Sequence, residues 1–342
     1  AGGGVKCWGD NTYGALGDGS ATAPQNPPEA SSATPVDVAG LSSGVTAIAV
    51  GQSAACAINA AGRVECWGDN ANGELGNGST MSVATMTNID SAVPVNVTGL
   101  ASGVTAIAHG QSFACALTTG GGVRCWGDNS IYGELGNGSA TSGPRPFSPT
   151  PVDVKGLSGV TAITAGLDFA CALTAAGGVK CWGHGGDVFD IGNFANSTVP
   201  FTVTDPALRG GVKAISAGAN YLCALAATGG VRCLGGDRYG QLGTGATAPP
   251  PGVSANVSGL TSGVTAIAAG GESACALTAV GGVKCWGNGY GLTPADIPSL
   301  TSGVTAIAAG WTQECAITTA NGVECWGAGQ NGASAPVAVP GL

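Results

Sequence analysis

The sequence predicts an all-β propeller built from short four-stranded blades. One pattern of roughly 40–60 residues recurs along the 342-residue chain, which is the period of a propeller, solenoid or array. Each complete copy carries two cysteines ten residues apart and four short β-prone runs. Helical periodicity is absent from these runs, whereas alternation and Gly/Pro boundaries favour strands. We therefore expect one propeller domain over residues 1–342.

The repeat boundaries follow from where the pattern restarts. An N-terminal half-unit, residues 1–41, carries only the third and fourth strands and predicts a half-blade. Six complete units follow, at residues 44–100, 103–157, 159–205, 211–260, 263–300 and 303–342.

Each complete unit contains its four strands in a fixed order. The first is VTAIAAG, as at Val264–Gly270, the second is ACALT and the third is GVKCWG. The fourth is a PVDV run, as at Pro151–Val154. Because strands crowd near the axis of a ring, the small side chains of the first strand place it innermost. The tryptophan of CWG then fills the wider gap where the blades diverge.

Twelve of the thirteen cysteines fall into pairs with one separation. On a hairpin such as ACALTTGGGVRCWG, the two cysteines lie opposite each other, with Cβ atoms about 4.5–5.5 Å apart. We expect six intrablade disulfides, each stabilising the fold by about 2–3 kcal/mol. Buried free thiols are one alternative, and a metal site is a weaker one because short C-x-x-C spacings are absent. The expected pairs are Cys56–Cys66, Cys115–Cys125, Cys171–Cys181, Cys223–Cys233, Cys275–Cys285 and Cys315–Cys325.

Disulfides indicate an oxidising compartment, so we expect an extracellular or cell-surface protein. The chain opens AGGGVKC, without a signal-peptide pattern, which indicates a processed or excised form. Cys7 lies in VKCWG of the half-unit and is expected to stay unpaired or to pair with another chain.

The charge balance restricts the class of partner. The net charge is −9, and the 11 basic residues are spread over the repeats without forming a stripe. Nucleic acid is therefore not an expected partner. No apolar run is long enough to span a membrane, so membrane insertion is not expected either.

The phrases WGDNxxGELGNG, SGVTAIAAG and ACAL resemble the regulator of chromosome condensation repeat family over nearly the whole chain. The resemblance implies a seven-bladed propeller. The same superfamily includes a secreted bacterial β-lactamase inhibitor protein with a similar SGVxAIAAG phrase, which implies enzyme inhibition as one possible function. A nuclear member exchanges nucleotide on a small GTPase and binds chromatin, but the acidic charge of this chain argues against that role.

Closing a ring in the family manner requires one more first and second strand beside the half-blade. Three interpretations stay open. The chain is a segment of a longer protein, or the ring closes with six blades and the N-terminal strands join an outer edge. Alternatively, a neighbouring chain completes the half-blade, and the contact propagates head-to-tail into a filament.

We expect no catalytic residue, cofactor or metal site, because the two histidines lie in different repeats and no glycine-rich stretch has a phosphate-loop context. The leading hypothesis is a non-enzymatic extracellular protein-interaction module; a filament subunit and a secreted enzyme inhibitor are the alternatives. The turns between first and second strands gather variable residues on one rim. The candidate partner-binding residues are Trp311, Gln313, Phe113, Asp168, Phe169, Asn220, Tyr221, Glu272 and His109.

Overall fold

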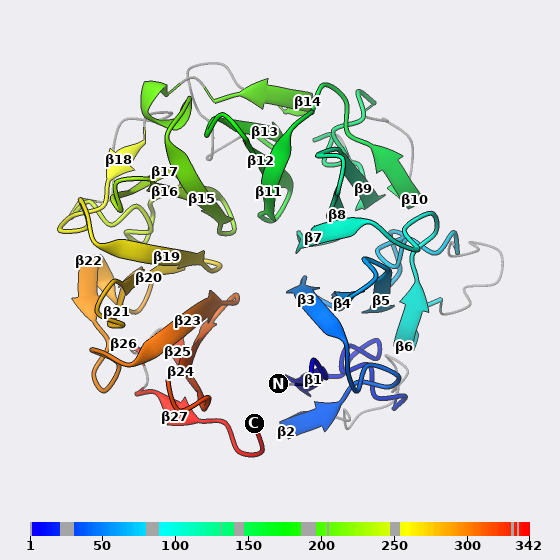
Figure 1. Ribbon diagram of the computed structural model, residues 1–342, viewed down its shortest axis with the longest axis horizontal. Coiled ribbons are helices and arrows are strands. Elements are labelled where there is room, and N and C mark those ends of the chain that lie inside the picture. The colour runs from blue at the N-terminus through cyan, green and yellow to red at the C-terminus, as the bar shows by residue number, and fades with distance from the viewer. Residues whose placement is uncertain are drawn as a thin grey trace.

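The computed structural model describes residues 2–20, 31–79, 89–130, 132–139, 147–185, 196–203, 205–246, 254–329, 332–333 and 335–342. These residues form a ring of six complete blades and one two-stranded sheet (Figure 1). All strand pairs are antiparallel, and within each complete blade the strands follow chain order from the centre of the ring outward. In the last blade, β26 and β27 both pair with β25. The predicted all-β propeller is confirmed.

The strands occupy four positions in each blade. The innermost strands are β3 (Val45–Val50), β7 (Val104–His109), β11 (Val160–Ala165), β15 (Val212–Ala217), β19 (Val264–Ala269) and β23 (Val304–Ala309). The second strands are β4 (Ala54–Asn59), β8 (Phe113–Thr118), β12 (Phe169–Thr174), β16 (Tyr221–Ala226), β20 (Ser273–Thr278) and β24 (Gln313–Thr318). The third strands are β5 (Val64–Gly68), β9 (Val123–Asp128), β13 (Val179–Gly183), β17 (Val231–Gly235), β21 (Val283–Gly287) and β25 (Val323–Gly329).

The outer strands are shorter and less regular. They are β6 (Ser91–Asn96), β10 (Phe147–Asp153), β14 (Ser197–Thr202), β18 (Ala255–Asn256), β22 (Gly291–Asp296), β26 (Gly332–Ala333) and β27 (Val337–Ala338). A single 3-10 turn, η1 (Pro206–Leu208), is present among the described residues. The half-blade consists of β1 (Lys6–Gly9) and β2 (Ser32–Asp37).

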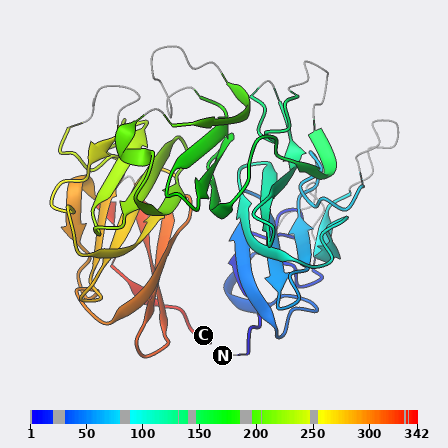
Figure 2. The ribbon, with the colours of Figure 1, turned by 45° about the horizontal axis from the view of Figure 1, so that its top comes forward.

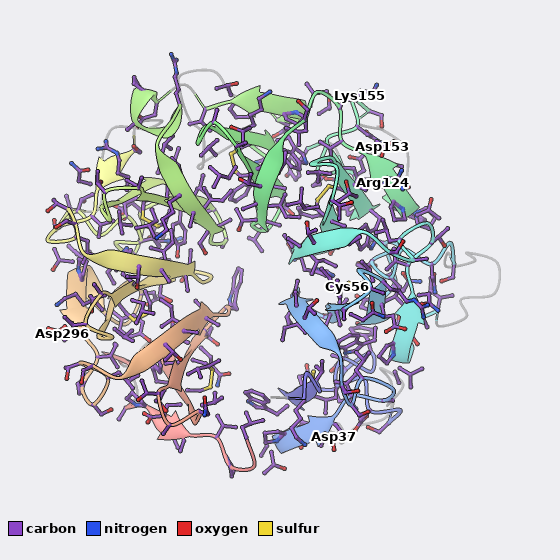
Figure 3. All side chains as sticks on the ribbon, in the orientation of Figure 1. Asp37, Cys56, Arg124, Asp153, Lys155 and Asp296 are labelled. Carbon is purple, nitrogen blue, oxygen red and sulfur yellow. A yellow bond between two sulfur atoms is a disulfide. The ribbon has the colours of Figure 1, made fainter. Side chains whose placement is uncertain are left out.

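Each complete blade contains one disulfide between its second and third strands. The paired cysteines are direct cross-strand partners, as Cys56 and Cys66 illustrate, with Cα atoms 4.0 Å apart. Figure 3 shows the sulfur pairs inside the blades, away from the central opening. All six predicted pairs are present, and Cys7 is the free cysteine. The alternatives of buried thiols and a metal site are therefore wrong for these twelve cysteines.

A tryptophan of the third strand joins each of several blades to the blade before it. The turn GDNxxGELG is held by a buried asparagine, for example by Asn70 Oδ1, which accepts from the Leu75 amide at 2.9 Å. The Trp126 indole N–H of the next blade donates to the Glu74 carbonyl of this turn at 2.7 Å. A Cβ at Gly76 would lie 2.8 Å from the same indole, so only glycine fits there. Equivalent bonds join Trp67 to Ala15, Trp182 to Glu134 and Trp286 to Gln241.

The half-blade occupies its own place in the ring. Val5, Val38 and Leu41 pack against Trp67 of the first complete blade, and β1 pairs with β2 in a separate sheet. The interpretation in which these strands join the outer edge of a six-bladed ring is therefore wrong, because β1 and β2 form a sheet of their own, which Figure 1 places between the last complete blade and the first. Figures 1 and 2 both place the N and C ends side by side at this point.

Candidate interaction surfaces

The turns between first and second strands form a connected rim, here called the loop rim. Its backbone hydrogen bonds pass from blade to blade: the Gln111 amide donates to Leu167, Leu167 to Ala219, and Ala219 to Gly271. The Gly271 amide then donates to the Gly310 carbonyl at 3.1 Å, which is the last bond of this series among the described residues. Because the backbone is held at both sides of each turn, the loop rim presents its side chains on a rigid support.

Four of the candidate residues on this rim are buried, and their prediction as partner contacts is corrected. Phe113, Phe169 and Tyr221 are each at most 1% exposed. Each begins a second strand, not a turn, and its ring covers the glycine three residues earlier in its own turn. The Tyr221 hydroxyl also donates to the Ser273 carbonyl of the next blade. These rings therefore hold the blades together.

His109 is buried at the end of β7. Its Nδ1 donates to the Gly110 carbonyl at 2.9 Å, and its ring lies against Gly51 of the preceding blade. Burial lowers the pKa of His109, so the ring is neutral at physiological pH. A neutral buried ring contributes packing and offers no charge to a partner.

The remaining candidates reach solvent. Trp311 is 57% exposed and rests on Gly271 of the preceding blade, and Gln313 is also exposed. Asp168, Asn220 and Glu272 are partly exposed. Burial raises the pKa of Asp168, while His184 nearby opposes that change, and Glu272 accepts a hydrogen bond from Asn288 at 2.8 Å. The exposed part of the loop rim is thus an aromatic side chain at one end of a row of polar groups.

A second surface lies between the last blade and the first, and we call it the open seam. One side presents Ile48 and Val50 of β3, which are 57% and 67% exposed. The other side presents Gln313 and Ile317 of β24, and Ile317 is 43% exposed. In the preceding blade Leu277 holds the same position as Ile317 and is only 6% exposed.

Sequence reasoning located the seam but missed these wall residues. The signal was available, because each isoleucine sits at a fixed repeat position next to the incomplete unit. A position that is buried by a neighbouring blade in other copies must be exposed where that neighbour is incomplete.

The internal pattern matches a known family of repeats. Residues 3–58 and 61–117 match the family profile described as regulator of chromosome condensation (RCC1) repeat. A second profile of that description matches residues 45–74, 104–134 and 160–187. The protein carries RCC1 repeats. The resemblance inferred from its repeated phrases is confirmed.

The chain is similar to several proteins with different names and contexts. The human E3 ubiquitin-protein ligase HERC2 is 34% identical over 187 residues, which cover 53% of this chain but 4% of that protein. The crystal structure of human WBSCR16 aligns with a TM-score of 0.81 at 21% identity, covering 98% of this chain and 93% of that one. Prp20p from Saccharomyces cerevisiae aligns with a TM-score of 0.78 at 18% identity, covering 98% and 86%. At these identities the structural matches establish the fold.

Within its described residues, this RCC1 propeller offers neither a metal-binding cluster nor a membrane-spanning helix. In the part of the chain that the structure describes, no three His, Cys, Asp or Glu side chains converge in a way that could hold a metal ion. The described residues also contain no helix with the length and apolarity needed to cross a membrane.

Two buried carboxyl groups belong to the GDNxxGELG-type turns whose carbonyls accept from the tryptophan of the next blade. Glu74 and Glu134 are 2% and 1% exposed. Burial, with a smaller contribution from Asp69, raises the pKa of Glu74 to about 7. Burial likewise raises the pKa of Glu134 to about 7, with smaller contributions from Asp128 and Asp168. Gln241 holds the same repeat position and, like Glu74, accepts from the amide two residues earlier.

Stability should therefore fall as the pH rises from 5 to 8. A carboxyl whose folded-state pKa is raised binds its proton more tightly in the folded protein. Its stabilising contribution is complete below the unfolded pKa of about 4.3 and is lost as the pH passes 7. We expect the Glu74→Gln/Glu134→Gln double variant to lose less stability over this range, because Gln241 shows that a neutral amide fits the site.

Thermal unfolding midpoints at pH 5, 6, 7 and 8 would measure this effect. Glu65→Gln, on the partly exposed face of β5, is the matched control and should keep the wild-type pH profile. If the double variant and wild type have parallel profiles, the two buried carboxyl groups do not cause the pH dependence.

Proposed function

We propose that this RCC1 propeller is a non-enzymatic extracellular protein-interaction module. The exposed Trp311 on a rim of hydrogen-bonded turns is the observation that carries the proposal. Aromatic side chains on rigid supports are favoured anchors in protein interfaces, since they bury much area at low entropic cost. Prp20p has binding properties towards Gsp1p and histones, and a crystal structure shows Kap60 bound to it. Those partners belong to that protein, and they support only the class of function.

Trp311→Ala should weaken partner binding by roughly 30-fold or more, the effect expected at an interface hot spot. Val280→Ala is the control, because Val280 is 76% exposed on the turn at the opposite end of its blade. The measurement is quantitative capture from the extracellular fraction of the native source with wild type and both variants as baits. A protein retained by wild type and Val280→Ala but lost with Trp311→Ala supports the proposal; identical capture by all three baits contradicts it.

The extracellular part of the proposal rests on the disulfides, which form and persist in oxidising compartments. In protein isolated from its native source and unfolded in denaturant, the twelve blade cysteines should resist alkylation until a reductant is added. Intact mass before and after reduction measures this directly. Alkylation of all twelve without reductant would remove the basis for an extracellular assignment.

A second candidate is a filament subunit that polymerises through the seam. The exposed apolar walls at Ile48 and Ile317 favour it, since such a surface is normally covered. A polymer of this kind should survive Trp311→Ala and dissociate when residues 1–9 are deleted, whereas a binder at the loop rim should show the reverse. Sedimentation velocity of both variants separates the two functions.

A further inference from the structure

The end of the ring that carries the loop rim is acidic. Because neighbouring strands of a blade run antiparallel, the turns between first and second strands and the loops after third strands lie at this same end. Carboxyl groups recur in these segments, as at Asp69 and Glu272, whereas Arg238 is the one Lys or Arg in them among the described residues. Lys155 and Arg209 instead lie in connections at the opposite end. A partner that docks on the loop rim therefore meets a negative surface.

Three carboxyl groups lie together at this end, where the second complete blade adjoins the third, and we call them the acidic pocket. Asp128 ends β9 and Glu134 lies in the turn that follows it, while Asp168 lies in the turn between β11 and β12 of the next blade. Burial is the largest cause of the raised pKa of Glu134, and the nearby charges of Asp128 and Asp168 both add to it. In the part of the chain that the structure describes, none of the three forms an ion pair with a lysine or arginine.

The acidic pocket contains a buried acceptor that has no donor. Glu134 is 1% exposed, its Oε1 accepts from the Ser130 hydroxyl at 2.6 Å, and its Oε2 has no hydrogen-bond partner among the described residues. Glu74, at the same repeat position, has both oxygens bonded to Asn72. The turn before Glu134 is one residue longer and has Tyr132 in the place of that asparagine. Because a buried carboxyl oxygen without a donor is costly, Oε2 points to a ligand that donates hydrogen bonds.

The repeat leaves space at this place between neighbouring blades. One blade earlier, a small polar cavity is lined by Asp69, Glu74 and Ser112, among other residues. Asp168 holds the repeat position of Ser112, so the later interface has a third carboxyl group where the earlier one has a hydroxyl. Since serine fits this position in the ring, the fold does not require the added negative charge of Asp168.

Two rings flank the acidic pocket. The His184 amide donates to the Asp168 carbonyl at 2.7 Å, and the centroids of the His184 and Tyr132 rings are 4.3 Å apart. Within the described residues the carboxyl groups do not converge closely enough to hold a metal ion. A guanidinium suits them better, because its five N–H donors reach acceptors that lie apart and its flat face stacks on aromatic rings. The ammonium of lysine is a compact point charge and lacks both properties.

We propose that the acidic pocket binds an arginine side chain of the protein partner that docks on the loop rim. This inference rests on the proposed function and names the chemistry of the partner. The guanidinium donates to the partly exposed Asp128 and Asp168, and its charge and remaining donors compensate the buried Glu134.

The test uses the 342-residue protein and two fluorescein-labelled peptides of equal charge, one of Gly-Arg repeats and one of Gly-Lys repeats. Fluorescence anisotropy at about 50 mM salt, where exposed charges are weakly screened, measures both dissociation constants. Asp168→Asn and Asp168→Ser remove the charge, and serine is the residue that this position has in the preceding blade. Glu65→Gln is the matched control, because it makes the same change in net charge on the partly exposed face of β5.

We expect the wild type to bind the arginine peptide at least about fivefold more tightly than the lysine peptide. Both Asp168 variants should weaken binding of the arginine peptide at least about tenfold, because hydrogen bonds between charged groups are strong. Glu65→Gln should change it less than about twofold. Equal losses in Asp168→Asn and Glu65→Gln would overturn the proposal, because overall charge alone would then attract the peptide.

Two further results would also overturn it. Equal affinity for the two peptides would mean that the acidic pocket does not distinguish a guanidinium from an ammonium. Displacement of the arginine peptide by spermidine, at an affinity equal to that of the peptide and dependent on Asp168, would make a free polyamine the ligand.

Capture from the native source separates this inference from the proposed function. With Asp168→Asn as an additional bait, the protein that depends on Trp311 should also be lost. If that protein is lost with Trp311→Ala but retained with Asp168→Asn, the acidic pocket is not part of the interface, and the proposed function stands without it. If no captured protein depends on Trp311 while the arginine peptide still requires Asp168, the proposed function fails and the chemistry of the acidic pocket stands.

Discussion

Replacing Trp126 with alanine should lower the free energy of unfolding by about 3–5 kcal/mol, the usual cost of truncating a large buried aromatic. Trp126 is fully buried, its indole N–H donates to the Glu74 carbonyl, and its ring lies against Gly76. Truncation would leave a cavity between two blades and a buried carbonyl without its donor. Both losses act at the contact that joins the blades, and not inside either blade.

Trp8 supplies the matched control, because it holds the same repeat position in the half-blade and is 37% exposed. Trp8→Ala should cost less than about 1 kcal/mol, as substitutions at exposed positions usually do. Guanidinium unfolding followed by circular dichroism, with the disulfides intact, gives both values. A cost at Trp8 equal to that at Trp126 would mean that burial between blades is not the source of the stability.

The strand order and the disulfides could be predicted because six copies repeat the same constraint. Taken as a single copy, Cys115 and Cys125 could each pair with a cysteine elsewhere in the chain. The same ten-residue separation in all the internal copies indicates one hairpin geometry, in which the two cysteines of a copy pair with each other. The placement of Trp126 between blades followed in the same way, from small residues in the first strand and a large one in the third. Internal repetition thus supplied the information that a single copy lacks.

The rim residues were harder to predict because exposure depends on the neighbouring blade. Trp311 lies within the turn between β23 and β24, whereas Phe113 is the first residue of β8, and the sequence carries no sign that Phe113 turns inward. The Phe113 ring lies against Gly110, whose missing side chain leaves room for it, while Trp311 precedes the equivalent strand position by two residues and reaches solvent. Asp168, Asn220 and Glu272 stay candidates for partner contact, because their partial exposure is compatible with that role.

Removing one blade disulfide should cost about 2–3 kcal/mol, the chain-entropy value for a loop of ten residues. The Cys171→Ala/Cys181→Ala variant is suitable, because both cysteines are fully buried and small apolar side chains replace them. Cys7→Ser, which removes no bond, is the control and should change stability by less than about 0.5 kcal/mol. Denaturant unfolding of both variants measures the difference, and a cost below that of Cys7→Ser would show that the hairpins close equally well without their disulfides.

The two kinds of contact act at different levels of the ring. Each disulfide closes a hairpin within one blade, whereas each buried tryptophan joins a blade to its neighbour. Effects at sites that share no contacts usually add to within about 0.5 kcal/mol. Combining the Cys171/Cys181 removal with Trp286→Ala, a change in a different blade, should therefore give the sum of the separate costs. A combined cost well above that sum would mean that loosening one hairpin weakens distant contacts, and the ring would then respond as a single cooperative unit.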